Sequence, residues 1–399
     1  MRDQCPARSL IAAMLGVSLA LCAWGCDSKS GASESSSDCD GPPGSCGAAA
    51  KKKKRPDEGG RASGSSTGAG GASISPKAAN PDATAAIEAQ EKREKGRQFT
   101  FTYRATIKPG DAEGAVDIFL PIAVDTPYQT IENRTIETEL NGSVKTESTY
   151  RNKYWHASLD SLPSEPISVT VRYDVDRRRF EREALKKQAK GSIDEQVREK
   201  YQLYLKPNKR VPVSGDLIEK VASDIGLKQK ETPLAAARAI YDYVIDTMEY
   251  KKVGDGWGNG DTYWACTEKY GNCTDFHALF TSLARYRDIP ARFDIGFPVP
   301  RNREAGQIGG YHCWIDFYLP GVGWTPIDAS EAKKRPEMRE LFFGAHPADR
   351  IHFTTGRDLV LGEAHDSKPL NYFIYPMVEV GGERYDGVET TFSYSEPDS

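Results

Sequence analysis

The sequence predicts an α+β protein in which a small antiparallel β domain precedes a domain of helices followed by strands. Three observations predict this fold class. Segments near residues 99 and 167 alternate apolar and polar residues, segments between residues 192 and 286 repeat apolar residues with helical spacing, and short strands follow them without strict alternation. About 300 residues from position 97 onward are enough for two domains with hydrophobic cores.

Residues 1–25 have the layout of an export signal. Arg2 and Arg8 precede the apolar run LIAAMLGVSLALCA, and the small residue Gly25 follows it. The stretch LCAWGC resembles a bacterial lipobox, which implies that Cys26 is lipidated and becomes the mature N-terminus. Simple secretion and an uncleaved anchor are the alternatives. We therefore expect an exported protein, periplasmic or at the cell surface, held at the membrane by an N-terminal lipid.

Residues 26–96 predict a disordered tether. This segment is rich in Ser, Gly, Ala and Asp and has almost no large apolar residues, so it cannot bury enough surface to offset the entropy of ordering. The run KKKKR at 51–55 is compatible with nucleic-acid binding in principle, but the export signal and the net charge of −4 favour a solvated spacer. No nucleic-acid partner is expected. Cys39 and Cys46 could close a small disulfide loop within the tether.

Residues 97–178 predict the antiparallel β domain. FTFTYRATI at 99–107 and ISVTVRYDV at 167–175 both show the period-two alternation of a half-buried strand. Pro109-Gly110 and Asn141-Gly142 supply turns between the strands.

Residues 179–399 predict the second domain, which begins with helices and ends with C-terminal strands. SIDE at 192–195 has the form of a capping box, with Ser192 and Glu195 at the helix start. GDLIEKVASDIG and TPLAAARAIYDYVIDTMEY then place apolar residues on one helical face, and Thr232 is the expected cap of the second of these helices. The three helices are interpreted as scaffold.

A further helix is predicted to start near Cys273. Asn272 is a good cap, so Cys273 would lie in the first turn, where unpaired amides and the helix dipole favour negative charge. This location lowers the pKa of a cysteine, and the thiolate is its reactive form. The position therefore makes Cys273 a candidate nucleophile.

A nucleophilic thiol needs a base and a group that orients the base. His312 directly precedes two predicted strands joined by Pro-Gly-Val-Gly, and Asp328 ends the second strand. The two side chains share a sheet face only if the register pairs position 312 with an even-numbered residue, because a one-residue slip reverses every side chain. We therefore predict an odd-length turn around Gly321, or a bulge.

The segments GNCTDFHALFTSLARYRDIPARFDIGFP and GGYHCWIDFYLPGVGWTPIDASEA resemble the bacterial branch of the transglutaminase-like superfamily. The likeness covers about residues 190–345, and RIHFTTGRDL and LNYFIYP also resemble bacterial members. It implies a papain-like fold and a Cys-His-Asp triad of Cys273, His312 and Asp328. The superfamily contains amide cross-linkers, peptidases, deglycosylating enzymes and inactive members, so the resemblance does not imply a substrate.

By the logic of such a triad, Cys273 attacks an amide carbonyl, His312 passes a proton to the leaving amine and Asp328 steadies the imidazolium. The backbone amide of Cys273 would hold the oxyanion together with one side-chain donor. Trp257 and Trp264 are the candidate donors, although either could only line the cleft.

The other cysteines and the nearby histidine have alternative roles. Cys266 and Cys313 could form a disulfide in an oxidising compartment, or remain two buried thiols. Cys313 is expected on the sheet face opposite His312 and outside the catalytic set. A zinc site of Cys266, Cys273, His277 and His312 is disfavoured, because zinc cysteines usually occur as C-x-x-C pairs. His277 lies one helical turn beyond Cys273 and is expected either to support the catalytic residues from behind or to pack in the core, rather than to act in the cleft.

We therefore expect a thiol enzyme that acts on protein or peptide amide bonds, by hydrolysis rather than cross-linking. Hydrolysis requires only water, whereas cross-linking needs a cleft that excludes water and admits a lysine. The alternatives are a protein-crosslinking transglutaminase and a non-catalytic, lipid-tethered binding module. No cofactor motif is present, and no acidic loop supports calcium dependence, so neither a cofactor nor a metal is expected.

Overall fold

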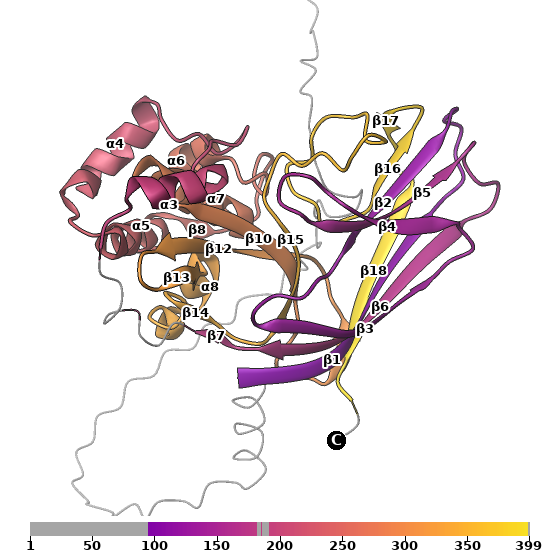
Figure 1. The fold of residues 1–399 in the computed structure, drawn as a ribbon, viewed down its shortest axis with the longest axis horizontal. Helices are drawn as coiled ribbons and strands as arrows, with labels where there is room; N and C mark the ends of the chain where they lie inside the picture. Colours follow the sequence, from indigo (N-terminus) through magenta and orange to yellow (C-terminus); the bar gives the residue numbers. More distant parts are fainter. Residues whose placement is uncertain (1–94, 182–184, 186–190, 398–399) are drawn as a thin grey trace, which may run out of the picture. The chain divides into compact units, whose positions relative to one another are not determined.

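The computed structural model describes residues 95–181, 185 and 191–397 (Figure 1). The predicted export signal, Cys26 and nearly all of the predicted tether lie outside the described residues. Within the described part of the chain, no helix is both long enough and apolar enough to cross a bilayer.

Two five-stranded antiparallel sheets form the β domain (Figure 1). The first sheet has the order β11-β18-β1-β6-β3 and the second has the order β17-β16-β2-β5-β4. The strands of the first sheet are β1 (Gly96–Ile107), β3 (Gln129–Glu137), β6 (Ile167–Arg178), β11 (Ala305–Gln307) and β18 (Val388–Ser395). Those of the second are β2 (Val116–Ile122), β4 (Gly142–Thr146), β5 (Lys153–Leu159), β16 (Met377–Val380) and β17 (Glu383–Arg384).

Strand β1 is at the centre of the first sheet because one of its faces is continuously apolar. Its alternate residues from Phe99 to Ile107 are at most 2% exposed, and the same alternation continues on β6. Strand β1 contains the segment predicted at 99–107, and β6 contains the segment predicted at 167–175. The prediction of two half-buried strands from their alternating pattern is therefore confirmed.

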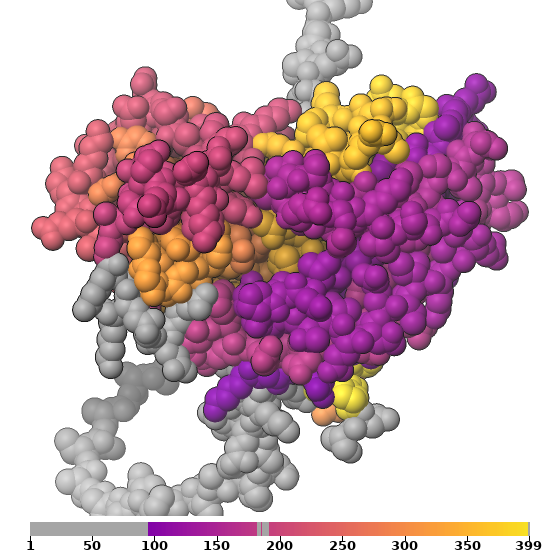
Figure 2. Space-filling model, in the orientation of Figure 1, coloured from indigo at the N-terminus to yellow at the C-terminus, as the bar shows by residue number. Residues whose placement is uncertain are grey.

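The C-terminal strands belong to these sheets, whereas we expected them in the second domain. Strand β18 pairs with β1 from Thr100↔Ser395 to Ile107↔Val388, and β16 pairs with β2. Figure 2 shows residues near the C-terminus, in yellow, against the N-terminal strands, in purple. The expectation was wrong because alternation identifies a strand and its buried face but not the partner with which it pairs.

The other domain packs helices on a four-stranded antiparallel sheet of order β13-β12-β10-β15, which confirms the α+β class. The sheet strands are β10 (Ala291–Pro298), β12 (His312–Leu319), β13 (Gly323–Ile327) and β15 (Arg350–Thr355). Short pairs join β7 (Phe180–Glu181) to β14 (Ala345–His346) and β8 (Glu249–Tyr250) to β9 (Tyr270–Gly271). The helices are α3 (Glu195–Lys200), α4 (Asp216–Asp224), α5 (Pro233–Thr247), α6 (Thr262–Glu268), α7 (Cys273–Tyr286) and α8 (Ala329–Lys334), with short 3-10 turns η1 (Gln202–Tyr204), η2 (Leu227–Gln229) and η3 (Pro336–Met338).

Two of the predicted helix caps can be compared with the structure. The Thr232 side chain accepts a hydrogen bond from the Ala235 amide at 3.1 Å and starts α5, as predicted. The predicted capping box at 192–195 is wrong, because Asp194 is the cap of α3 and its carboxylate accepts from the Val197 amide at 2.9 Å. Ser192 and Asp194 are both good capping residues, so local sequence did not decide between them.

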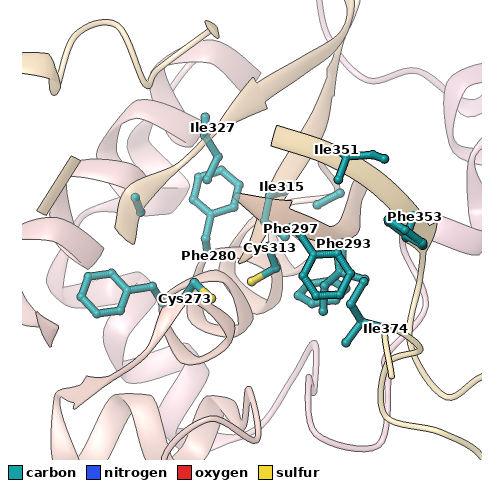
Figure 3. Close-up of a cluster of buried hydrophobic side chains, with 14 of the residues drawn as sticks. Cys273, Phe280, Phe293, Phe297, Cys313, Ile315, Ile327, Ile351, Phe353 and Ile374 are labelled. Atoms are coloured by element: carbon teal, nitrogen blue, oxygen red, sulfur yellow. The ribbon is translucent and has the colours of Figure 1, made fainter. Parts of the chain in front are cut away.

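Helix α7 lies at the centre of this domain. All its residues from Cys273 to Arg285 are buried, because α7 packs on β12 and β10 on one side and on α5 and α6 on others. Figure 3 shows Phe280 of α7 facing Cys313 and Ile315 of β12. The Phe280 ring also lies 5.9 Å from the ring of Phe317. This packing fixes the first turn of α7 against the first residues of β12.

Candidate active site

Cys273 is the first residue of α7, and its helix start is closed by a reciprocal capping box. The Asn272 side chain accepts a hydrogen bond from the Thr274 amide at 2.9 Å, and the Asp275 carboxylate accepts from the Asn272 amide at 2.9 Å. Cys273 is 2% exposed. The predicted cap and the predicted position of the thiol are therefore both confirmed, and the first-turn amides favour a negative sulfur.

Strands β12 and β13 bring His312 and Asp328 together. The pairs Leu319↔Gly323 and Ile315↔Ile327 leave a three-residue turn over 320–322, so the predicted odd-length turn around Gly321 is confirmed. Positions 312 and 328 consequently share a sheet face. His312 Nε2 lies 2.7 Å from Asp328 Oδ2, and both side chains are buried.

Asp328 is held by the start of α8 as well as by His312. It is the N-cap of this helix, and its Oδ1 accepts hydrogen bonds from the Glu331 amide and the Ser330 hydroxyl, each at 3.0 Å. Oδ2 therefore remains for the imidazole. The carboxylate has little freedom to rotate, so it fixes the orientation of the His312 ring through Nε2. The other ring nitrogen, Nδ1, is then not used by Asp328.

The electrostatics of these groups favour a thiolate beside an imidazolium. Burial alone raises the pKa of Cys273, but hydrogen bonds from Cys313 and His312 and the charge of His312 outweigh it, and the pKa lies well below its ordinary value. Burial lowers the pKa of His312, yet the charge of Asp328 and its hydrogen bond raise it to about 9. Burial disfavours ionised Asp328, but the charge and hydrogen bond of His312 hold its pKa well below the usual range.

A family model of the transglutaminase-like superfamily matches residues 220–329, which include all three of these residues. Residues 220–329 form a transglutaminase-like core.

Individual proteins resemble the chain over greater lengths. An uncharacterized protein of Haemophilus influenzae is 27% identical over 343 residues, which cover 74% of this chain and 90% of that protein. A proposed cysteine protease from Cytophaga hutchinsonii aligns with a TM-score of 0.49 and 16% identity, over 76% of this chain and 92% of that one. The periplasmic domain of TgpA from Pseudomonas aeruginosa, bound to ethylmercury, aligns with a TM-score of 0.29 and 14% identity, over 64% and 97% of the two chains.

Arg350, which no sequence pattern singled out, is a buried partner of Asp328. It is the first residue of β15 and 2% exposed, and its Nη1 donates to Asp328 Oδ2 at 3.1 Å. Its guanidinium also lies 5.0 Å from the centroid of the Trp314 ring. One feature of the sequence could have identified Arg350: it is a charged residue at the start of a strand that holds no other Lys, Arg, Asp or Glu. A buried charge is costly without a partner, so such an arginine predicts a buried carboxylate nearby.

Of the two alternatives for Cys266 and Cys313, a disulfide or two buried thiols, the structure has the second, because Cys266, Cys273 and Cys313 are all free and buried. Cys313 faces α7, where its sulfur lies 3.4 Å from His277 Nδ1. Cys313 directly follows His312 on β12, and the packing of α7 on this strand brings it close to the site from which we expected it to be absent. Cys266 lies on α6, where burial raises its pKa to about 11.

His277 is a second imidazole beside Asp328. It is fully buried, one turn along α7 from Cys273, and its Nε2 lies 3.7 Å from Asp328 Oδ1. Burial lowers the pKa of His277 to about 4, so the ring is neutral at neutral pH. The aspartate therefore lies between two histidines, of which only His312 is held protonated.

Neither tryptophan offers its indole N–H to an oxyanion. Trp257 Nε1 donates to the Gly254 carbonyl at 2.9 Å, and Trp264 Nε1 donates to the Tyr270 carbonyl at 3.0 Å. Neither candidate therefore supplies the side-chain donor in this conformation, in which Trp257 bonds within the glycine-rich loop and Trp264 joins α6 to β9. The backbone amide of Cys273 keeps its predicted place among the first amides of a helix, which have no intrahelical partner.

The glycine-rich loop at 254–260 is fixed to the helix start by Asp275. Its carboxylate accepts from the Gly258 amide at 2.7 Å and the Gly260 amide at 2.9 Å, in addition to the Asn272 amide. Burial raises the pKa of Asp275 to about 6 even though these three amides oppose the shift. Arg357 fixes the other side of the loop by donating to the Gly260 carbonyl at 2.7 Å. The loop is thus held rigidly beside the thiol.

The thiol is closed off by neighbouring side chains. Tyr250 packs on Phe276 of α7 with ring centroids 6.0 Å apart, and the Lys334 ammonium lies 4.6 Å from the Tyr250 ring. Burial, and then the charge of Cys273, raise the pKa of Tyr250, which places this ring near the sulfur. Because Cys273 is 2% exposed, a substrate carbonyl can reach it only if neighbouring side chains move. Among the residues that the structure describes, no group of three or more Cys, His, Asp or Glu side chains is placed to hold a metal ion.

Proposed function

We propose that this protein is a thiol hydrolase of protein or peptide amide bonds that works through Cys273, His312 and Asp328. The observation that carries the proposal is the 2.7 Å contact between His312 and Asp328 at the start of β12, beside a cysteine at the start of a helix. The match of residues 220–329 to the transglutaminase-like superfamily supports an enzyme of this type.

In the proposed reaction, Cys273 Sγ attacks the amide carbonyl carbon, and the oxyanion is held by the Cys273 backbone N–H. His312 donates its Nδ1 proton to the departing amine, while Asp328 keeps the ring oriented through Nε2. Water then attacks the thioester, with His312 taking its proton, and the carboxylic acid leaves. An amine that attacked in place of water would make the same site a transferase.

The experiment follows the fate of the acyl group. The purified protein is incubated with a peptide mixture in water enriched in heavy oxygen, with and without an excess of a primary diamine. We expect new carboxylates that carry heavy oxygen from the wild type and from Cys266→Ala, the matched cysteine control, and none from Cys273→Ala or His312→Ala.

Two results contradict the hydrolase. Amine-linked products in excess of new carboxylates identify a cross-linking transglutaminase. Identical peptide mixtures from the wild type and Cys273→Ala favour the non-catalytic binding module.

The proposal includes export and a lipid anchor at Cys26, supported by the signal-like pattern of residues 1–25 and by the lipobox-like LCAWGC. The N-terminal peptide of the mature protein, isolated from membranes, should begin at Cys26 and carry acyl chains. An unmodified mature N-terminus at another position contradicts the anchor.

A further inference from the structure

Cys273 and Cys313 face one another between α7 and β12. Figure 3 shows the two sulfur atoms turned toward each other. Cys313 is fully buried and Cys273 is 2% exposed. The proposed hydrolysis gives Cys313 no role, and a Cys266–Cys313 disulfide does not form, so a second free thiol lies directly beside the candidate nucleophile.

The second thiol has an imidazole of its own. Cys313 Sγ is 3.4 Å from His277 Nδ1, and His277 Nε2 is 3.7 Å from Asp328 Oδ1. Because His277 is neutral, a proton on Nε2 faces the aspartate and leaves Nδ1 free to accept from Cys313. Two Cys–His pairs, Cys273 with His312 and Cys313 with His277, thus share one carboxylate.

We propose that Cys313 is the resolving thiol of Cys273, so that oxidation by a peroxide closes a reversible disulfide between them. The proposal rests on the proposed function in two respects, the reactive thiolate of Cys273 and the export that exposes it to oxidants. An exported chain meets oxidants that a cytoplasmic thiol does not, and a lone oxidised cysteine proceeds to irreversible sulfinic and sulfonic acids unless a second thiol intercepts it. The pair would protect the nucleophile and suspend its activity until a reductant restores it.

The steps balance with hydrogen peroxide as the oxidant. The Cys273 thiolate attacks one peroxide oxygen, the S–O bond forms, the O–O bond breaks, and the departing hydroxide takes the proton of His312 and leaves as water. Cys313 then passes its proton to His277 and attacks the sulfur of Cys273. The S–S bond forms, the S–OH bond breaks, and hydroxide leaves as water with the His277 proton. Two thiols are oxidised and one peroxide is reduced to two waters.

Burial sets the order of these steps. Cys313 is shielded from solvent, its pKa is raised well above the ordinary value by burial and then by its hydrogen bond to Cys273, and it is not the first site of attack. Cys273 carries the thiolate and must become reachable for substrate, so a molecule as small as peroxide reaches it first. Cys266 is the internal control, because it is a buried thiol on α6 whose pKa is raised to about 11 and it is not part of this pair.

The test treats the reduced protein with hydrogen peroxide, blocks free thiols with iodoacetamide and maps the peptides by mass. We expect a Cys273–Cys313 linkage in the wild type and in Cys266→Ala, with Cys273 alkylation recovered after dithiothreitol. In Cys313→Ala, measured against its own reduced starting value, the recovered fraction should fall at least about fivefold because Cys273 proceeds to sulfinic acid. Cys313→Ser keeps a hydroxyl beside His277 and serves the same purpose if the alanine variant does not fold.

Two outcomes overturn the resolving role. One is peroxide treatment that oxidises Cys273 without any linkage to Cys313. The other is recovery in Cys313→Ala or Cys313→Ser equal to that in Cys266→Ala. Rapid alkylation of reduced Cys273 in the same experiment leaves the proposed hydrolase standing, so failure of this inference is distinguishable from failure of the proposed function.

Discussion

Replacing Asp328 with asparagine removes the charge that holds His312 protonated while keeping the size of the side chain. Burial alone lowers the pKa of His312, but Asp328 and, to a smaller extent, Cys273 nevertheless raise it from 6.5 to about 9. That difference of about 2.5 pH units corresponds to about 3 kcal/mol. In Asp328→Asn the pKa of His312 should therefore fall, because the largest influence that opposes burial is lost and only Cys273 still opposes it.

The loss of the imidazolium should be visible at Cys273. The thiolate is stabilised in part by the charge of His312, so the pKa of Cys273 rises when that charge is lost. In the wild type, alkylation of Cys273 by iodoacetamide should change little between pH 9 and pH 6. In Asp328→Asn the rate at pH 6 should fall at least about tenfold relative to pH 9, because each pH unit of thiol pKa changes the thiolate fraction tenfold.

The assay measures site-resolved alkylation by mass at both pH values, and the melting temperature shows that the variant is folded. Asp246→Asn is the matched control, since Asp246 pairs with Arg339 at the surface, away from the thiol. The reasoning is refuted if Asp328→Asn is folded and keeps the wild-type ratio of rates at pH 6 and pH 9.

Two further predictions concern the stability of the site. Arg350→Met removes one of the two cations beside the buried Asp328 carboxylate and leaves only His312, so the free energy of unfolding in urea should fall by about 3 kcal/mol. Arg238→Met breaks a partly exposed pair and should cost about 1 kcal/mol or less, and equal losses contradict the buried pairing. Gly271→Ala places a Cβ 2.2 Å from Asp275 Oδ2 and should lower the free energy of unfolding by about 1–3 kcal/mol. The control Gly309→Ala, whose Cβ has no atom within 4 Å, should leave the free energy of unfolding unchanged. A Gly271→Ala variant as stable as the wild type contradicts the close packing at the helix start.

The sequence predicted the parts of the site that depend on neighbouring residues. The helix start at Cys273 follows from Asn272, whose side chain caps locally whatever the rest of the chain does. The meeting of His312 and Asp328 follows from strand alternation and from the parity of one turn, and both are properties of a short segment. Such features need no knowledge of distant partners.

Features that depend on distant partners were missed or wrong. Arg350 reaches Asp328 only because β15 pairs with β10, and β18 joins the first sheet only because β1 leaves it an edge. The indole of Trp264 donates to a carbonyl whose position is set by a loop. Cys313 was expected outside the site, and only the packing of α7 on β12 brings it beside His277.

The most direct test of an activated thiol at Cys273 is labelling with a thiol-directed acyl probe at pH 6, read by the mass of the Cys273 peptide. The wild type should form the thioester, Cys273→Ala should not, and His312→Ala should label at least about tenfold more slowly because the thiolate loses its imidazolium. Equal labelling of Cys273 in the wild type and in folded His312→Ala contradicts the triad.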